Sequence, residues 1–134
     1  MKRQNIQPAS LSKRVVGGHV LYSHVVVVEG RKTIFVYGQL ARSPSGDVVG
    51  RGDMGAQIRQ VGENVKAALA AAGATLADIV KTNTYVTDID EFFKHPDVRA
   101  DIFGQSLPTS TTVEVRRLSH PDLMVEIEAV AMID

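Results

Sequence analysis

Apolar residues recur at steps of three and four between residues 53 and 72, and this spacing predicts an amphipathic helix. The apolar stripe consists of Met54, Ile58, Val61, Val65, Leu69 and Ala72. Asp53 precedes it and is a good N-cap, because its side chain can accept hydrogen bonds from the free N–H groups of the first turn. Gly73 follows it, in the position where a glycine often ends a helix. A shorter helix is predicted around 97–103, with Pro96 in its first turn.

Segments rich in β-branched and alternating apolar residues predict the strands of the fold. These segments are 19–28, 33–37, 78–87, 111–118 and 124–133, and a further short strand fits 3–6. Only the turn 29–32 separates the first two long segments, so they are predicted to form a hairpin. The segment 41–52 contains Pro44 and several glycines and is predicted to be a loop.

The order of these elements, β-β-α-β-α-β-β, predicts an α+β fold in which two helices cover one face of a mixed sheet. With 134 residues, the chain is long enough for one domain, 1–134, with its own core. The other face of the sheet carries the semi-polar set Lys81, Tyr85, Glu126 and Glu128. Such a face suits contact with another subunit, and we expect a homo-oligomer.

Composition excludes several classes of protein. Fifteen basic residues balance fifteen acidic ones, so nothing indicates a nucleic-acid partner or a polybasic membrane surface. The absence of cysteine excludes thiol nucleophiles, disulfides and iron–sulfur clusters. The run Val25–Val28 is far too short to span a membrane, and no apolar stretch follows the first basic residues. We expect a cytoplasmic protein.

The sequence contains no standard nucleotide-binding or hydrolase motif, and its four histidines lack metal-ligand spacing, so we expect neither a cofactor nor a metal. Glu126 and Glu128 lie on one face of the last strand, roughly 6.6 Å apart. They either pair with cations or serve as acid and base. The segment 50–52 before the first helix either binds an anion or is a glycine-rich turn.

Several segments, in this order, are similar to the RidA/YjgF/L-PSP family. They are Ala72-Gly73-Ala74, Asp78-Ile79-Val80-Lys81-Thr82, Tyr85-Val86-Thr87-Asp88, Pro108-Thr109-Ser110-Thr111-Thr112-Val113-Glu114-Val115 and Val125-Glu126-Ile127-Glu128-Ala129-Val130-Ala131. Tyr22-Ser23, Gly38-Gln39, Asn64 and Phe92 fit the same pattern. The resemblance covers almost the whole chain from about residue 20.

The resemblance implies a chorismate-mutase-like fold assembled as a homotrimer, with ligand clefts between subunits. It also implies hydrolysis of enamines and imines to 2-keto acids and ammonia. Carried over by position, it assigns the catalytic glutamate to Glu126 and substrate contacts to Tyr22, Gly38 and Gln39. Three further positions of the implied binding site differ from the family pattern. Tyr37 occupies the position of a serine, Ser110 that of the carboxylate-binding arginine and Thr112 that of a cysteine.

The departure at Ser110 changes the expected substrate. A guanidinium grips a carboxylate through two charge-assisted hydrogen bonds, whereas a serine hydroxyl is neutral. The expected cleft is therefore more neutral and suits an imine or enamine without a small 2-carboxylate, unless Arg42 reaches the cleft and compensates.

Three interpretations stay open at this stage. The first is a hydrolase acting on enamine or imine C–N bonds. The second is a non-catalytic trimer that binds a small molecule or has a regulatory role, because a shared fold does not determine function. The third is the ribonuclease activity of the L-PSP name, against which the balanced charge counts. The expected partners are a small-molecule ligand and further copies of this chain.

Overall fold

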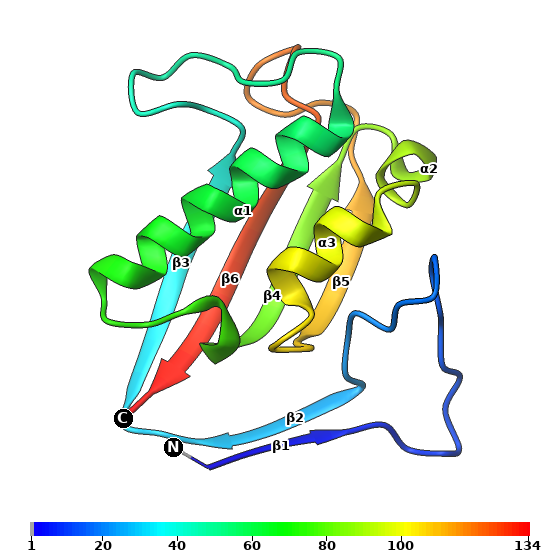
Figure 1. Ribbon diagram of the computed structural model, residues 1–134, viewed down its shortest axis with the longest axis vertical. Helices are drawn as coiled ribbons and strands as arrows, with labels where there is room; N and C mark the ends of the chain where they lie inside the picture. The colour runs from blue at the N-terminus through cyan, green and yellow to red at the C-terminus, as the bar shows by residue number, and fades with distance from the viewer. Residues whose placement is uncertain (1) are drawn as a thin grey trace.

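A four-stranded mixed sheet with helices on one face forms the centre of the fold, and a two-stranded ribbon lies at its base (Figure 1). The computed structural model describes residues 2–134. Its elements are β1 Lys2–Ile6, β2 Val25–Glu29, β3 Lys32–Leu40, α1 Met54–Ala71, η1 Leu76–Asp78, β4 Ile79–Val86, α2 Ile89–Phe92, α3 Pro96–Phe103, β5 Thr109–Glu114 and β6 Val125–Ile133. The sheet has the order β3-β6-β4-β5, with β4 and β5 parallel and the other pairs antiparallel. The predicted α+β class is confirmed.

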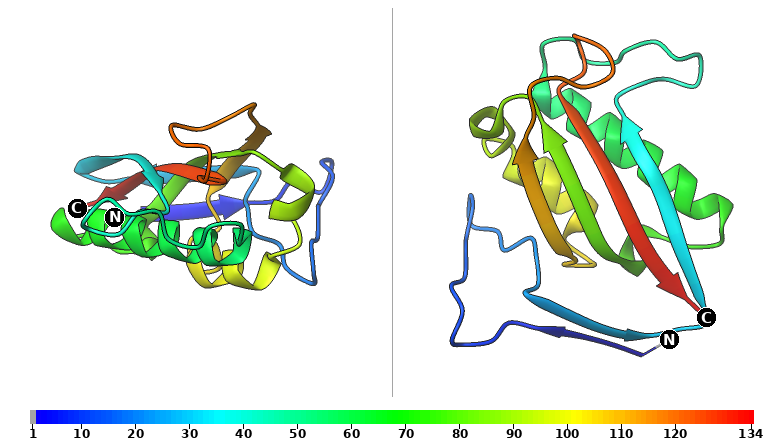
Figure 2. Two further views of the ribbon diagram at one scale, coloured as in Figure 1. Left: turned by 90° about the horizontal axis from the view of Figure 1, so that it is seen from above. Right: turned by 180° about the vertical axis from the view of Figure 1, so that it is seen from behind.

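Helix α1 packs along the sheet with the predicted stripe facing inward. Met54, Ile58, Val61, Val65 and Leu69 are all buried. The Asp53 side chain accepts a hydrogen bond from the Ala56 N–H at 3.0 Å, as expected for an N-cap. Ala72, the last stripe position, is instead the exposed C-cap, and Gly73 follows it with a φ of +79°. Figure 2, seen from above, shows all helices on the same side of the sheet.

Two polar side chains of α1 fix the loops at the upper end of the sheet. The fully buried Gln57 donates to the carbonyls of Gly50 and Asp122 and accepts from the Met124 N–H. Asn64 donates to the carbonyls of Leu40 at 2.8 Å and Arg42 at 3.0 Å. Because Leu40 ends β3, Asn64 holds the end of this strand against the helix.

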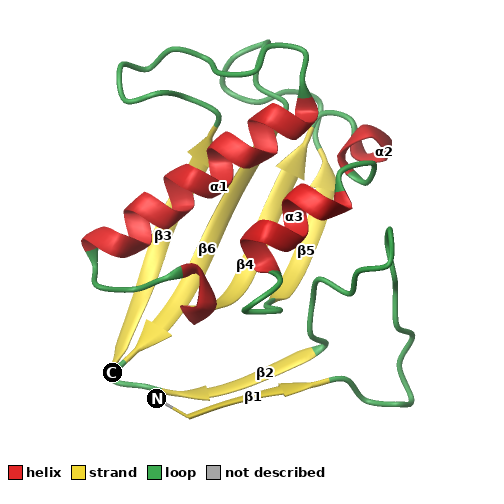
Figure 3. Cartoon of the chain, in the orientation of Figure 1, coloured by secondary structure: helices red, strands yellow, loops and turns green. Residues whose placement is uncertain are grey.

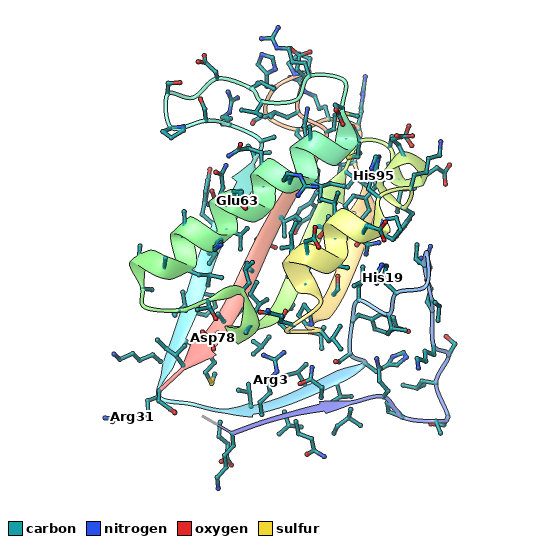
Figure 4. All side chains as sticks on the ribbon, in the orientation of Figure 1. Arg3, His19, Arg31, Glu63, Asp78 and His95 are labelled. Carbon is teal, nitrogen blue, oxygen red and sulfur yellow. The ribbon has the colours of Figure 1, made fainter. Side chains whose placement is uncertain are left out.

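The predicted hairpin between 19–28 and 33–37 is wrong. β2 begins only at Val25, and its ladder partner is β1 rather than β3. The β1–β2 ribbon leaves the sheet at the turn before β3 and lies across its lower end, as Figure 3 shows. Side chains of β1 hold it there, since Arg3 donates to the Ser106 and Ala77 carbonyls and lies close to the turn that carries Asp78 (Figure 4). The pattern of apolar residues predicts where strands occur, but it does not predict hydrogen bonds to carbonyls that are distant in the sequence.

Two further expectations near β5 are corrected. The strand predicted for 111–118 covers Thr109–Glu114 instead. Its partner β4 ends at Val86, which pairs with Glu114, so no strand remains for 115–118 to pair with. The short helix α2 was not predicted; Asp88 caps it by accepting from the Glu91 N–H at 3.0 Å.

The sheet face opposite the helices is open and carries both aromatic and charged groups. Phe35 and Tyr37 are 79% and 85% exposed. The alternation along β6 places Glu126 and Glu128 on this face, whereas Val125, Ile127 and Ala129 point into the core. Within residues 2–134, no helix is both long and apolar enough to cross a bilayer.

Candidate functional site

The site residues inferred from the sequence fall into two groups in one chain. Tyr22, Ser110 and Thr112 line a cavity at the β5 edge of the sheet. The second group consists of Tyr37, Gly38, Gln39 and Glu126 on β3 and β6. The two groups are described separately because the structure surrounds each with different chemistry.

The first group is assembled by hydrogen bonds between the N-terminal segment and the residues before β5. The Ser23 hydroxyl donates to the Leu107 carbonyl at 2.6 Å, and the Ser23 N–H donates to the Pro108 carbonyl at 3.1 Å. Asn5 also donates to the Leu107 carbonyl, at 3.0 Å. Leu107 has a φ of +42°, a left-handed conformation that is uncommon outside glycine. These contacts bring Tyr22 beside the first residues of β5.

Tyr22 is held on the rim of the cavity by the loop before it. Its hydroxyl accepts a hydrogen bond from the Arg14 N–H at 2.8 Å and donates to the Ser12 carbonyl at 3.2 Å. Ser110 lies on the same sheet face as Thr82, and their hydroxyls are 3.2 Å apart. That face is the one the helices cover, so Ser110 and Thr112 point toward α2 and α3.

The cavity carries cationic side chains, whereas the sequence led us to expect a more neutral cleft between subunits. It has a volume of about 600 Å³, and Arg14, Lys81 and Arg99 line it together with His19 and His24. No Asp or Glu of the described chain is among its lining residues. Arg42, suggested above as a substitute for the family arginine, does not line it; its guanidinium donates to the Gly46 carbonyl in its own loop at 2.8 Å.

In the second group, Gly38 lies directly beneath the Glu126 carboxyl group. A Cβ at residue 38 would be 2.9 Å from Glu126 Cδ, so this close approach requires a glycine unless the Glu126 side chain moves. The β3 ladder shifts register between Val36 and Gln39, where the side-chain amide of Gln39 donates to the Tyr37 carbonyl at 3.0 Å. The irregularity places the Gly38 backbone against the carboxyl group.

Glu126 and Glu128 lie on one face but in opposite electrostatic environments. Burial, with the neighbouring Glu128 charge adding to it, raises the pKa of Glu126 above its usual range. Hydrogen bonds from Asn83 and Tyr85, both 2.9 Å long, lower the pKa of Glu128. Glu126 has no hydrogen-bond or ion-pair partner among residues 2–134. A pair of carboxyl groups whose pKa values are pushed apart is a common basis for assigning acid and base roles.

The two groups cannot meet within one chain. Ser110 points to the helix side of the sheet, whereas Glu126 points to the open side. In addition, β4 lies between β5 and β6, so the two strands are about 10 Å apart. A site that uses both groups therefore needs a second copy of the chain.

Among residues 2–134, no group of three or more His, Asp or Glu side chains is close enough to hold a metal ion. The segment 50–52 is a turn: the Asp53 N–H donates to the Gly50 carbonyl, and Arg51 lies 3.4 Å from an Asp122 carboxylate oxygen.

Sequence reasoning missed three residues of these environments: Asn83, Arg14 and Arg99. It placed Tyr85 on the open face but did not predict its contact with Glu128. Asn83 shares this face of β4 with Tyr85, so its register with Glu128 could have been found from the strand pairing. Arg14 and Arg99 carry no comparable signal, because only the tertiary structure brings the N-terminal loop and α3 to the same cavity.

Comparison with known proteins agrees with the resemblance seen in the sequence. Residues 16–133 match the family described as Endoribonuclease L-PSP. A RutC family protein, PH0854 of Pyrococcus horikoshii, is 43% identical over 98 residues, which are 73% of this chain and 77% of that protein. The 2-iminobutanoate/2-iminopropanoate deaminase of Salmonella typhimurium is 37% identical over 102 residues, 74% of this chain and 78% of the deaminase. The crystal structure of YyfB, a protein of unknown function of the Rid family from Yersinia pestis, superimposes with a TM-score of 0.84 at 32% identity, covering 99% of this chain and all of that one. The chain therefore belongs to the RidA/YjgF/L-PSP family.

Proposed function

We propose that this protein hydrolyses an imine or enamine small molecule, with Glu126 as the general base. The observation that carries the proposal is the Glu126 carboxyl group, which lies over the Gly38 backbone with a raised pKa and without a partner in the described chain. A relative 37% identical to this chain is named as a deaminase of 2-iminobutanoate and 2-iminopropanoate, and this supports the reaction class.

In the proposed reaction, Glu126 accepts a proton from water as the water oxygen attacks the imine carbon. Glu126 passes this proton to the imine nitrogen, and a carbinolamine results; an enamine follows the same route after tautomerising to the imine. The C–N bond then breaks, the hydroxyl proton is transferred to the nitrogen, and ammonia leaves as the carbonyl forms. One water is consumed for each ammonia and carbonyl product, and no oxidant or cofactor is needed.

We further propose that the site is complete only between subunits of a homotrimer. The separation of Ser110 and Glu126 on opposite sheet faces supports an intersubunit cleft. The exposed Phe35 and Tyr37 on the open face support burial of this face against other copies, because aromatic side chains are usually sheltered from water. Light scattering at micromolar concentration tests the assembly, and a monomeric mass would contradict it.

The substrate is proposed to differ from those of the imine deaminases because Ser110 stands where the family has its arginine. Ser110 cannot form the pair of charge-assisted hydrogen bonds that an arginine at this position of β5 would form with a carboxylate. Any anionic group of the substrate must then be bound by other residues, and its position relative to the reacting carbon changes.

Ammonia release tests the reaction. 2-Iminobutanoate and other imines are generated with an amino-acid oxidase, and the rate above buffer is measured for wild type, Glu126→Gln and Glu126→Ala. Glu63→Ala is the matched control, because Glu63 is an exposed glutamate on α1. The proposal expects activity that both Glu126 variants lose and the control keeps. Wild-type rates equal to buffer for every imine would reject it.

A binding function without turnover is the second candidate, and the 600 Å³ cavity beside Ser110 favours it. Glu126 is not among the residues that line this cavity, and the lining offers hydroxyl and cationic groups for binding. Saturable binding of a small molecule by a protein that hydrolyses no imine would support this second function.

A further inference from the structure

Three cationic side chains line the cavity at the β5 edge, and no Asp or Glu of residues 2–134 is among its lining residues. Arg14 comes from the N-terminal loop, Lys81 from β4 and Arg99 from α3. Three acidic residues of the nearby helices have other partners: Glu91 contacts Lys94 and His95, Asp97 contacts His19, and Asp101 lies 3.9 Å from Arg59. The Lys81 charge acts on Glu128 at the open face. Arg14 and Arg99 are thus the cations of the cavity without an ion-pair partner among residues 2–134.

Arg99 is the most unusual member of this cluster. Its guanidinium carbon lies 4.7 Å from the centre of the Phe92 ring and 5.1 Å from that of Phe93. Nε and Nη1 are enclosed, and neither has a hydrogen-bond partner. Burial and repulsion by Arg14 lower the pKa of Arg99 to about 10, so it still carries its charge at neutral pH.

Such an arrangement is unfavourable without a ligand. Buried donors are almost always paired in folded proteins, and an unpaired charged donor costs more than a neutral one. Arg14 adds a second guanidinium, 4.2 Å from the centre of the Phe93 ring. Two guanidinium groups stacked on the same phenylalanine repel each other, and an anion bound near both offsets this repulsion.

The remaining walls indicate the kind of anion. Ser110 and Thr112 offer hydroxyl groups, whereas Val16, Leu21 and Ile89 offer apolar surface. The volume of about 600 Å³ is that of a small-molecule site. An organic molecule with one oxyanion group can contact both the polar and the apolar lining residues, whereas an inorganic ion cannot fill the space beside the apolar ones.

We propose that this cavity binds a small organic oxyanion and that Arg99, assisted by Arg14, is the anchor, in place of the arginine that Ser110 replaces. The inference goes beyond the proposed function, because it concerns binding and holds whether or not the ligand is hydrolysed. The group that the cavity recognises is an oxyanion, and the ligand can carry it either as a carboxylate or as a phosphate ester.

Isothermal titration calorimetry tests the proposal with the full chain. The probes are 2-oxobutanoate for the carboxylate and glycerol 3-phosphate for the phosphate ester, with 2-butanone and glycerol as their neutral counterparts. The variants are Arg99→Met, which keeps an unbranched side chain against the phenylalanines, and Arg59→Met as the matched control. Arg59 is an exposed arginine on α1 that does not line the cavity and whose ion-pair contact, with Asp101, is 3.9 Å long and exposed to solvent.

We expect at least one oxyanion to bind and its neutral counterpart not to bind. Arg99→Met should weaken that binding by about tenfold or more, the loss of one charge-assisted contact, while Arg59→Met changes it little. Without ligand, Arg99→Met should unfold at the same or a higher urea concentration than wild type, because an unpaired buried charge has been removed. This measurement separates lost binding from lost folding.

Three results would overturn the proposal. They are the absence of binding by either oxyanion, equal binding of the neutral counterpart, and unchanged affinity in Arg99→Met. None of them depends on turnover, because neither probe has a C–N bond to hydrolyse. A failure here leaves the Glu126 hydrolysis test unaffected, and the two proposals can fail independently.

Discussion

The same substitution, glutamate to glutamine, should have opposite effects on stability at two positions of β6. Glu126 is in an environment that disfavours its charge, and its pKa is raised by burial and by Glu128. Glu128 accepts hydrogen bonds from Asn83 and Tyr85, and these lower its pKa. At pH 7.5 we therefore expect Glu126→Gln to stabilise the fold and Glu128→Gln to destabilise it.

Solvent limits the size of both effects. Glu126 is only partly buried, so the gain from removing its charge is about 0.2–1 kcal/mol, comparable to an exposed ion pair. In Glu128→Gln the two hydrogen bonds change from charged to neutral acceptors, which costs about 0.5–1.5 kcal/mol in total. The difference between the variants is then larger than either effect alone.

The pH dependence provides a second check, because the native and unfolded states bind different numbers of protons. Native Glu126 holds its proton to a higher pH than the unfolded chain, so its penalty grows as pH rises from the unfolded pKa through the native one. The Glu128 contribution is complete above the unfolded pKa and is lost as pH falls through the lowered native pKa. Both effects should therefore shrink at about pH 4.

Urea unfolding at one fixed protein concentration, at pH 7.5 and at pH 4, measures these effects, and Glu63→Gln on the exposed side of α1 is the control. If both variants change the free energy of unfolding in the same direction at pH 7.5, the reasoning is refuted, because the two carboxyl groups would then share one environment. Effects of the same size at both pH values would show that charge is not their cause.

Three other substitutions test the core, a buried polar bridge and the proposed site. Leu69→Ala should destabilise the fold by about 2–5 kcal/mol because Leu69 is fully buried, and Glu63→Ala by less than about 0.5 kcal/mol; similar urea midpoints would mean that the wrong helix face was assigned to the core. Gln57→Leu should cost about 2–4 kcal/mol in urea unfolding, since it leaves the Asp122 carbonyl and the Met124 N–H without partners and removes one of the two donors to the Gly50 carbonyl; a change within error would show that water replaces the amide. Ser110→Arg should raise the rate of ammonia release from 2-iminopropanoate above that of wild type, and the gain should disappear when Glu126→Ala is added; no gain would indicate that the cleft has diverged beyond this residue.

Elements defined by local chemistry could be predicted from the sequence. The α1 stripe, its Asp53 cap and the glycine that follows it depend on neighbours within a few residues, and all three are present in the structure. The alternation along β6 separates buried from open positions for the same reason, since successive side chains of a strand point to opposite faces. In both cases the information lies within one element.

The N-terminal ribbon could not be placed in this way. Two apolar strands joined by a short turn are typical of a hairpin, and the pattern of 25–28 and 33–37 fits one. The position of β2 depends instead on β1 and on the hydrogen bonds from Arg3 and Asn5 to the segment before β5, about a hundred residues away in the sequence. Local turn chemistry carries no information about such distant acceptors.

The candidate site shows the same limit in chemical terms. Position-by-position comparison located Ser110 and Glu126, and from the loss of one arginine it led to the expectation of a neutral cleft. Charge in a cavity is a sum over all elements that line it, and the residues that supply it here come from the N-terminal loop, β4 and α3. A motif on β5 shows which residues that strand contains, but it gives no information about cationic side chains on other elements. For this reason the electrostatic character of the cavity depends on the packing of Arg14 and Arg99 around Phe93 rather than on the motif itself.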